Sequence, residues 1–568
     1  MATLSQQAPA PRDALRDAKL VRDFRQVLLW PLQLRPLKES TQIQRHWEVL
    51  KALPNNPWHP LVIGRKELSS SALTRGAEGS DRFEERHYNE LVTFLPFVQR
   101  FLYGEGTGGE RESPMRVFRR DDIRLLRVTL TPGAAPFVFD VAHIDLYFFF
   151  DIDVVVLNVE ISARDLPLAT AQEVMYRFGR AYPAGWDRRG NNVHSVHKAE
   201  WLTADGSVAV ESDSNERDKF LAFVDQRRVP RVASHWAHLL SPLVQDQSDA
   251  TGSLRYRQIE YYRMPMMAYL ALENPRVLSR NDFVRLGLVT GAGDDESLPY
   301  ADRHVADFEQ RFCYDRFWND AGDGPDGRST RYLCCGHGLV VVGDAHWPFF
   351  TDADAGVLAQ FRHQHFLLFL IAHFQKAALL MFSDQLVHAL ERLEVGDPES
   401  VKRFKRVIRQ RFEVFLRFTH RYWFHDVSEH AVTKALFHMC SEHLGLDPLY
   451  AEVKERIHDM DEYLDSDSLR RQANTVVRLT VVTIFGLIGT ITTGFLGMNL
   501  IAAAEEPFAQ KVLYTAIVLL VTIWLTAYTV VKSKRLSDFL DALSDERLSA
   551  RQKLRSLVDV VRRRGPDR

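Results

Sequence analysis

Two long apolar runs near the C-terminus differ from the rest of the chain, where apolar and polar residues alternate over short distances. Leu479 to Leu496 is a run of 18 residues without a charge, and Val512 to Val531 is a second such run of 20. At about 1.5 Å rise per residue, a helix of either length can cross a hydrocarbon core of roughly 30 Å. The pattern therefore predicts a transmembrane hairpin over residues 476–531, with spans at about 476–497 and 512–531.

A third apolar stretch, Phe366 to Phe382, is interrupted by polar side chains. His373, Gln375 and Lys376 lie within it, and such groups are costly inside lipid. This stretch is therefore expected to be a buried helix of a soluble body.

Long helical patterns with clear stop signals lie upstream of the hairpin, in residues 351–475. The first runs from about Asp354 to Glu394 and the second from about Ser400 to Leu444, and Gly and Pro residues follow each of them. The third begins at Leu449 and continues without Gly or Pro until Gly486, inside the first span. A single stalk helix of about 48 residues, roughly 70 Å long, is expected there.

The N-terminal half shows short runs rich in Val, Ile, Phe and Tyr, which predict strands. These runs are Arg124 to Leu130, Pro136 to Val141, Ile144 to Phe150 and Val154 to Ile161. A helix follows, with Thr170 and Glu173 in the register of a capping box. Residues 21–350 are expected to form an α/β domain on a mainly antiparallel or mixed sheet. The predicted fold class is an α+β membrane protein with an N-terminal cytoplasmic α/β domain, a long helical stalk and a two-helix C-terminal transmembrane hairpin.

The flanking charges predict the orientation of the hairpin. Basic residues lie outside the two runs: Arg470, Arg471 and Arg478 before the first, and Lys532, Lys534 and Arg535 after the second. The connecting loop carries only Lys511 against Glu505 and Glu506. Because basic flanks stay on the cytoplasmic side, both termini are expected to face the cytoplasm of a cell whose plasma or inner membrane holds the hairpin. Residues 532–568 form a basic amphipathic tail.

Composition restricts the remaining function classes. The 72 Lys and Arg nearly balance the 74 Asp and Glu, so the bulk charge gives no reason to expect a nucleic acid partner. The four cysteines have no zinc-site or disulfide spacing, and residues 1–20 lack the apolar core of a signal peptide and are expected to be flexible. No nucleophile–base constellation is evident, so the chain is not predicted to be an enzyme.

The triplet Gly497-Met498-Asn499 stands at the outer end of the first span. Mg²⁺ dehydrates reluctantly and prefers oxygen ligands, so the carboxamide oxygen of Asn499 can contact the hydrated ion through its waters. Gly497 permits an unusual backbone geometry at the helix end, and Met498 is expected to pack against the turn.

This triplet, together with the stalk helix and the short acidic loop, resembles the signature of the CorA superfamily of magnesium channels. The resemblance covers about Leu449 to Arg535. It implies a homopentamer whose first spans line a central pore, with five copies of the triplet forming the outer mouth. Leu496 and Ile488 depart from the family, which usually has an aromatic residue and a proline there; these differences bear on ion selectivity more than on the fold.

Polar residues in the first span recur with helical spacing. Thr483 and Thr490 are seven residues apart and share a face with Leu487, which we expect to line the pore. The resemblance implies that Thr490 is the pore threonine and that Leu487, Leu479 and Val476 form apolar constrictions. The alternative is that the threonines bond to their own backbone.

Two acidic groups have both a functional and a structural interpretation. Glu505 and Glu506 either concentrate cations at the outer mouth or belong to an ordinary solvated loop. Asp461, Glu462 and Asp465 lie on the stalk within an acidic cluster. The resemblance implies that a divalent cation bridging subunits there keeps the channel closed when intracellular magnesium is high. The alternative is a solvated helix face.

The expected function is passive uptake of Mg²⁺ by a membrane protein that assembles with itself and needs no cofactor beyond the ions it carries or senses. One alternative is a transporter of Zn²⁺, Co²⁺ or Ni²⁺ in the same superfamily. The other is a membrane-anchored sensor or scaffold without transport.

Overall fold

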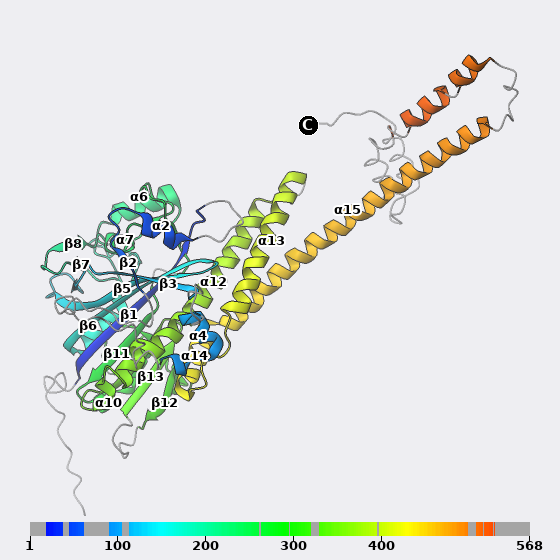
Figure 1. Ribbon diagram of the computed structural model, residues 1–568. Helices are drawn as coiled ribbons and strands as arrows, with labels where there is room; N and C mark the ends of the chain where they lie inside the picture. Colours follow the sequence, from blue (N-terminus) through cyan, green and yellow to red (C-terminus); the bar gives the residue numbers. More distant parts are fainter. Residues whose placement is uncertain are drawn as a thin grey trace, which may run out of the picture. The chain divides into compact units, whose positions relative to one another are not determined.

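The computed structural model describes residues 19–37, 45–61, 90–104, 113–260, 263–294, 296–319, 329–394, 397–497, 507–514, 516–525 and 528. The chain divides into two compact units, Met1–Ile457 and His458–Arg568. The first unit combines a large sheet with helices (Figure 1), which confirms the predicted mixture of α and β structure.

The strands described in the first unit form one mixed sheet. Their order along its main path is β12-β13-β14-β11-β1-β6-β5-β4-β7-β8, while β10 pairs with β1 and β9, and β3 pairs with β2 and β5. Most neighbours are antiparallel, but β11–β14 and β10–β9 are parallel. The bounds are β1 Leu20–Leu34, β2 Trp58–Leu61, β3 Met115–Arg120, β4 Leu125–Thr129, β5 Phe137–Phe149, β6 Ile152–Pro167, β7 Lys198–Leu202, β8 Val208–Glu211, β9 Val244–Gln245, β10 Arg255–Gln258, β11 Met266–Leu272, β12 Cys313–Trp318, β13 Ser329–Cys335 and β14 Gly338–Asp344.

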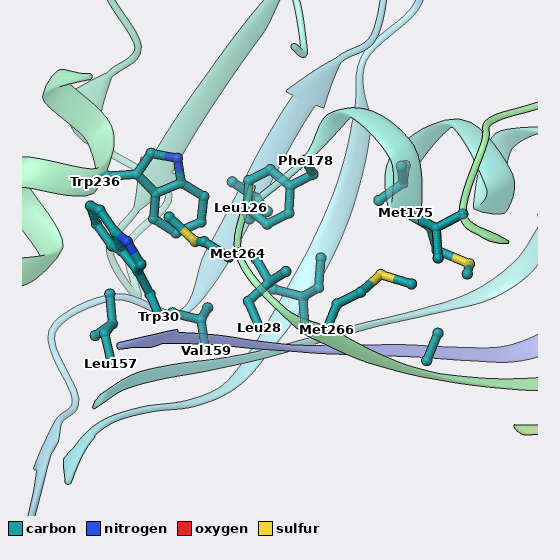
Figure 2. Packing of buried hydrophobic residues seen from close by; sticks show 14 of the residues in the cluster. Leu28, Trp30, Leu126, Leu157, Val159, Met175, Phe178, Trp236, Met264 and Met266 are labelled. Carbon is teal, nitrogen blue, oxygen red and sulfur yellow. The ribbon is translucent and has the colours of Figure 1, made fainter. Parts of the chain in front are cut away.

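The two long central strands, β1 and β6, place alternate side chains on opposite faces of the sheet. Leu28 and Trp30 of β1 point into one core layer, where they meet Phe178 and Trp236 (Figure 2). On the other face, α12 (Phe366–Glu391) packs against β1 and β6. Both faces are therefore covered, which explains why consecutive residues are buried from Gln26 to Leu32 of β1 and from Val154 to Ile161 of β6.

Shorter helices surround the sheet and connect its strands. They are α2 His46–Ala52, α4 Pro96–Tyr103, α5 Leu168–Arg177, α6 Arg217–Arg227, α7 Ser234–Leu240, η1 Pro275–Val277, α8 Arg280–Leu288, η2 Asp302–His304, α9 Phe308–Phe312 and α10 Pro348–Thr351. The predicted capping box in α5 is wrong, because the helix begins before Thr170, with Pro167 at its N-cap. Glu173 instead accepts the Ala292 backbone N–H at 2.9 Å.

The apolar stretch with internal His, Gln and Lys is a core helix, as predicted. The segment Val357–Glu391 is long and apolar enough to cross a membrane, yet 83% of its most apolar window is buried. It starts as α11 (Val357–Gln360), widens into the π-helical turn η3 (Phe361–His365) and continues as α12. Phe361 lies against Tyr269 of the sheet, and Phe366 lies against Tyr147.

The second predicted helix, Ser400 to Leu444, is wrong as a single element. The structure has α13 (Pro398–Arg421) and α14 (Ala431–Leu444), separated by a non-helical segment. Buried hydrogen bonds stabilise a non-helical conformation in the segment between Arg421 and Ala431. The Tyr422 hydroxyl donates to the Phe150 carbonyl at 2.7 Å, and the carbonyls of Tyr422 and Phe424 accept from the Gln375 amide at 2.9 and 3.3 Å.

The third predicted helix is present as α15, which runs from Leu446 to Gly497 over 52 residues. It begins after Gly445, whose left-handed backbone (φ +63°) ends α14 at the predicted stop signal. The absence of Gly and Pro from 449 to 485 leaves the helix without a local reason to break.

Candidate functional site

The predicted pore-lining residues lie on one exposed face of α15, in the second unit. Val476, Leu479 and Leu487 are 62%, 67% and 59% exposed. Thr483 and Thr490 are exposed on the same face. We call these five residues the threonine–leucine face. A large apolar surface of this kind is unfavourable in water, so it requires lipid or another protein surface as a partner.

The opposite side of α15 contacts the second apolar helix. Gly489 is buried, and a Cβ added there would lie 2.4 Å from Cγ2 of Thr522. At about 100° per residue, Gly489 is roughly 120° around the helix from the centre of the threonine–leucine face. The glycine thus permits close approach of the two helices of the hairpin, and the threonine–leucine face points away from that contact.

The threonine hydroxyls bond to their own helix, as the alternative interpretation expected. Thr483 donates to the Leu479 carbonyl at 2.8 Å, and Thr490 donates to the Gly486 carbonyl at 2.9 Å. A hydroxyl that donates in this way still has acceptor lone pairs. Both oxygens can therefore accept hydrogen bonds from water or from the hydration shell of a cation.

Helices of the length and composition needed for a membrane span occur twice in the described part of the chain. One is the buried segment Val357–Glu391, and the other is Phe508–Leu525, of which none is buried. Thr475–Thr490 forms a shorter apolar helix within α15. By burial, Phe508–Leu525 rather than the core helix is the segment available to a bilayer.

Several predicted site residues fall where the structure gives no side-chain description. Gly497 is the last residue of α15. Met498, Asn499, Glu505 and Glu506 lie outside the described residues. Their assignment as selectivity motif and outer-mouth charges therefore remains a prediction from the sequence.

Two of the three stalk carboxylates, Asp461 and Glu462, have described side chains. Asp461 and Glu462 are exposed neighbours on α15, and Asp465 follows on the same helix, without a described side chain. Among the described residues, no group of three or more His, Cys, Asp or Glu side chains is placed to hold a metal ion.

Sequence reasoning missed a buried charge cluster between the sheet and the π-helical turn. Glu160 of β6 is 1% exposed. Its carboxylate lies 3.1 Å from both the Arg25 and the Arg362 guanidinium and 3.3 Å from Nδ1 of His143. Burial alone would raise the pKa of Glu160, but His143, Arg362 and Arg25 hold it at about 2. The sequence signal was the acidic residue inside the predicted strand Val154 to Ile161, whose other residues except Asn158 are apolar.

Comparison of the chain with protein-family models, with curated proteins and with solved structures gives no match.

Proposed function

We propose that this chain is a CorA-like divalent-cation channel that carries Mg²⁺ passively into the cytoplasm through a homopentameric pore. The observation that carries the proposal is the separation of two surfaces on the first span. One side of α15 contacts the second helix at Gly489, and the exposed threonine–leucine face lies about 120° around the helix from that contact. Five copies that bring these faces together around an axis would cover the apolar surface and enclose a path for ions.

Each predicted residue has a role in this pore. Rings of Leu487, Leu479 and Val476 would close it by excluding water, while the hydroxyl oxygens of Thr490 and Thr483 would accept hydrogen bonds from the waters of a hydrated ion. Glu505 and Glu506 would raise the local cation concentration at the outer mouth.

The membrane potential is sufficient to drive the ion. One elementary charge gains about 2.3 kcal/mol per 100 mV, so a divalent cation gains about 4.6 kcal/mol. Passive entry down this gradient requires no nucleotide hydrolysis.

Ion uptake by the purified full-length chain tests the proposal. Reconstituted in liposomes with an inside-negative potential, it should accumulate Mg²⁺ and should elute as five copies by light scattering. Parallel assays with Zn²⁺, Co²⁺ and Ni²⁺ identify the preferred ion. Zn²⁺ uptake that depends on a proton gradient, without Mg²⁺ uptake, would assign the chain to zinc transport. A folded protein that moves none of these ions would contradict the channel and favour a membrane anchor.

The predicted topology places only the loop between the spans outside the cell. A cysteine introduced at Ala503 should react with a membrane-impermeant maleimide in intact cells, whereas one at Ser549 should react only after lysis. The native cysteines can stay in place, because Cys313, Cys334, Cys335 and Cys440 are all buried. The unsubstituted chain is the control and should remain unlabelled. Labelling of Ser549→Cys in intact cells, or none of Ala503→Cys, would mean that the hairpin is inverted or absent.

A further inference from the structure

Helix α13 has an unusually basic exposed side. The helix carries eight Lys and Arg against two Glu. Lys402, Arg406 and Arg409 are exposed at i, i+4 and i+7, which places them on one face. We call these three residues the basic stripe. The apolar side of α13, with Phe404 and Ile408, is buried.

The first part of α15 has the opposite charge. Residues 446–467 contain eight Asp and Glu against two Lys and Arg. Glu455, Asp459 and Glu462 are exposed and have the same i, i+4, i+7 spacing as the basic stripe. We call them the acidic stripe. Each stripe extends over about 10 Å of helix, at 1.5 Å per residue.

The contact between α13 and α15 within one chain uses other surfaces. The rings of Phe415 and Tyr450 stack with centroids 5.8 Å apart. Val453 and Ile457 of α15 are buried, at 0% and 3% exposure. At about 100° per residue, the acidic stripe is roughly 170° around α15 from this apolar side. The stripe therefore faces away from the side of α15 that packs within the chain.

The stripes have almost no charge partners among the described residues. Among the described residues, Arg406 and Arg409 form no ion pair, and neither do Glu455, Asp459 and Glu462; Lys402 has only a 3.9 Å contact with the exposed Glu399. Three like charges on one helix face repel one another. A second helix with the opposite charges at the same spacing would remove this repulsion on both sides, as paired charges do between the helices of coiled coils.

We infer that the basic stripe of one copy docks on the acidic stripe of a neighbouring copy and forms an electrostatic contact between subunits. The inference rests on the self-assembly in the proposed function but not on ion transport. A lipid surface fits the basic stripe less well, because the apolar side of α13 is buried and cannot insert, and because lipid would leave the acidic stripe without a partner.

Glu462 belongs both to the stalk carboxylates and to the acidic stripe, so the contact gives it a second partner besides a metal ion. Mg²⁺ and the guanidinium groups of a neighbour would compete for this carboxylate. Millimolar Mg²⁺ should therefore weaken the contact more than an equal ionic strength of Na⁺ does.

Cross-linking of the assembled full-length protein tests the inference. A carbodiimide should join Lys402 to Glu455, Asp459 or Glu462 by an amide bond. If ¹⁵N-labelled and unlabelled chains are mixed before assembly, cross-linked peptides should carry one labelled and one unlabelled half. If both peptides of every cross-linked pair carry the same label, the contact lies within one chain and the inference is overturned.

Charge reversal provides the matched control. The pair Arg406→Glu and Arg409→Glu should lower the yield of the mixed Lys402–Glu455 cross-link about tenfold, since two attractions become repulsions. Adding Asp459→Arg and Glu462→Arg, which leaves Glu455 as the cross-linkable carboxylate of the acidic stripe, should restore that cross-link. Arg188→Glu with Arg217→Glu, exposed arginines elsewhere, should leave the yield unchanged. If Arg406→Glu with Arg409→Glu leaves the cross-link yield unchanged, the inference is overturned. It is also overturned if this variant assembles normally but no longer binds phosphatidylserine vesicles, because the basic stripe would then bind lipid. Failure of ion uptake with these cross-links present would count only against the channel.

Discussion

Replacing Asn499 by alanine should reduce Mg²⁺ uptake into liposomes at least about tenfold while leaving the assembled protein intact. In the proposed pore, five carboxamides hold the hydrated ion by hydrogen bonds to its waters. Alanine removes every one of these acceptors at the outer mouth. Asn499 follows Gly489 by ten residues in the sequence, so its replacement should not disturb the contact between the two spans at Gly489.

A matched variant on the same helix separates conduction from packing. Thr493 is half-buried and lies on the Gly489 side of α15, so Thr493→Val should keep most of the uptake. The measurement is fluorescence of a Mg²⁺ indicator inside the liposomes, with light scattering to check the number of copies. If Asn499→Ala carries Mg²⁺ at the wild-type rate, the triplet does not select the ion. If it loses uptake because it no longer assembles, its role is structural.

Replacing Glu160 by glutamine should lower the free energy of unfolding of the soluble body by roughly 3 kcal/mol at pH 7. The carboxylate is buried against Arg25 and Arg362, and glutamine leaves these two cations without their shared counter-charge. The magnitude follows from the pKa of Glu160, which is lowered from 4.5 to about 2, at about 1.4 kcal/mol per unit.

The direction of the pKa shift of Glu160 determines how its contribution to stability depends on pH. Because the folded-state pKa lies below the unfolded value, the stabilisation is complete above about pH 4.5 and is lost as the pH falls toward 2. Urea unfolding of the full chain, followed by tryptophan fluorescence, should show the difference between wild type and Glu160→Gln shrinking over this range. Asp225→Asn, at a side chain 81% exposed, should change stability by less than about 0.5 kcal/mol. A difference that is independent of pH would mean that the ionised carboxylate does not stabilise the fold.

The long helices could be predicted from the sequence because their signals are local. Periodicity and the absence of Gly and Pro were enough for α15, and the polar interruptions of an apolar run were enough to identify α12 as a core helix. The break after Arg421 could not be predicted, since it depends on contacts of Tyr422 with Phe150 and Gln375, which are distant in the sequence.

Strand limits were less predictable for the same reason. Two short predicted runs are a single strand, β5, which passes through an irregularity in its pairing with β6 between Val141 and His143. The sequence suggested a break there, but pairing with β6 keeps the strand continuous. Strand β1 was not predicted as an element, and its Pro31 argues against a central strand from sequence alone.

For the candidate pore, the sequence predicted only which residues share one face of α15. Helical spacing alone groups Thr483, Leu487 and Thr490 on one side of α15, and the structure leaves that side exposed. The charge cluster around Glu160 was not predictable, because strand register and the π-helical turn bring Arg25 and Arg362 to it from 135 and 202 residues away.

The π-helical turn Phe361–His365 sets how the helical segments before and after it are rotated relative to each other about the helix axis. A π turn contains about one residue more than an α turn, so it acts as an insertion that rotates the preceding segment by about 100° relative to an uninterrupted helix. With this offset Arg362 reaches Glu160 and His365 packs edge-on against Tyr332. Deleting one residue from the turn would restore a regular α-helix. Either Arg362 or the apolar side of α12 would then point away from the sheet.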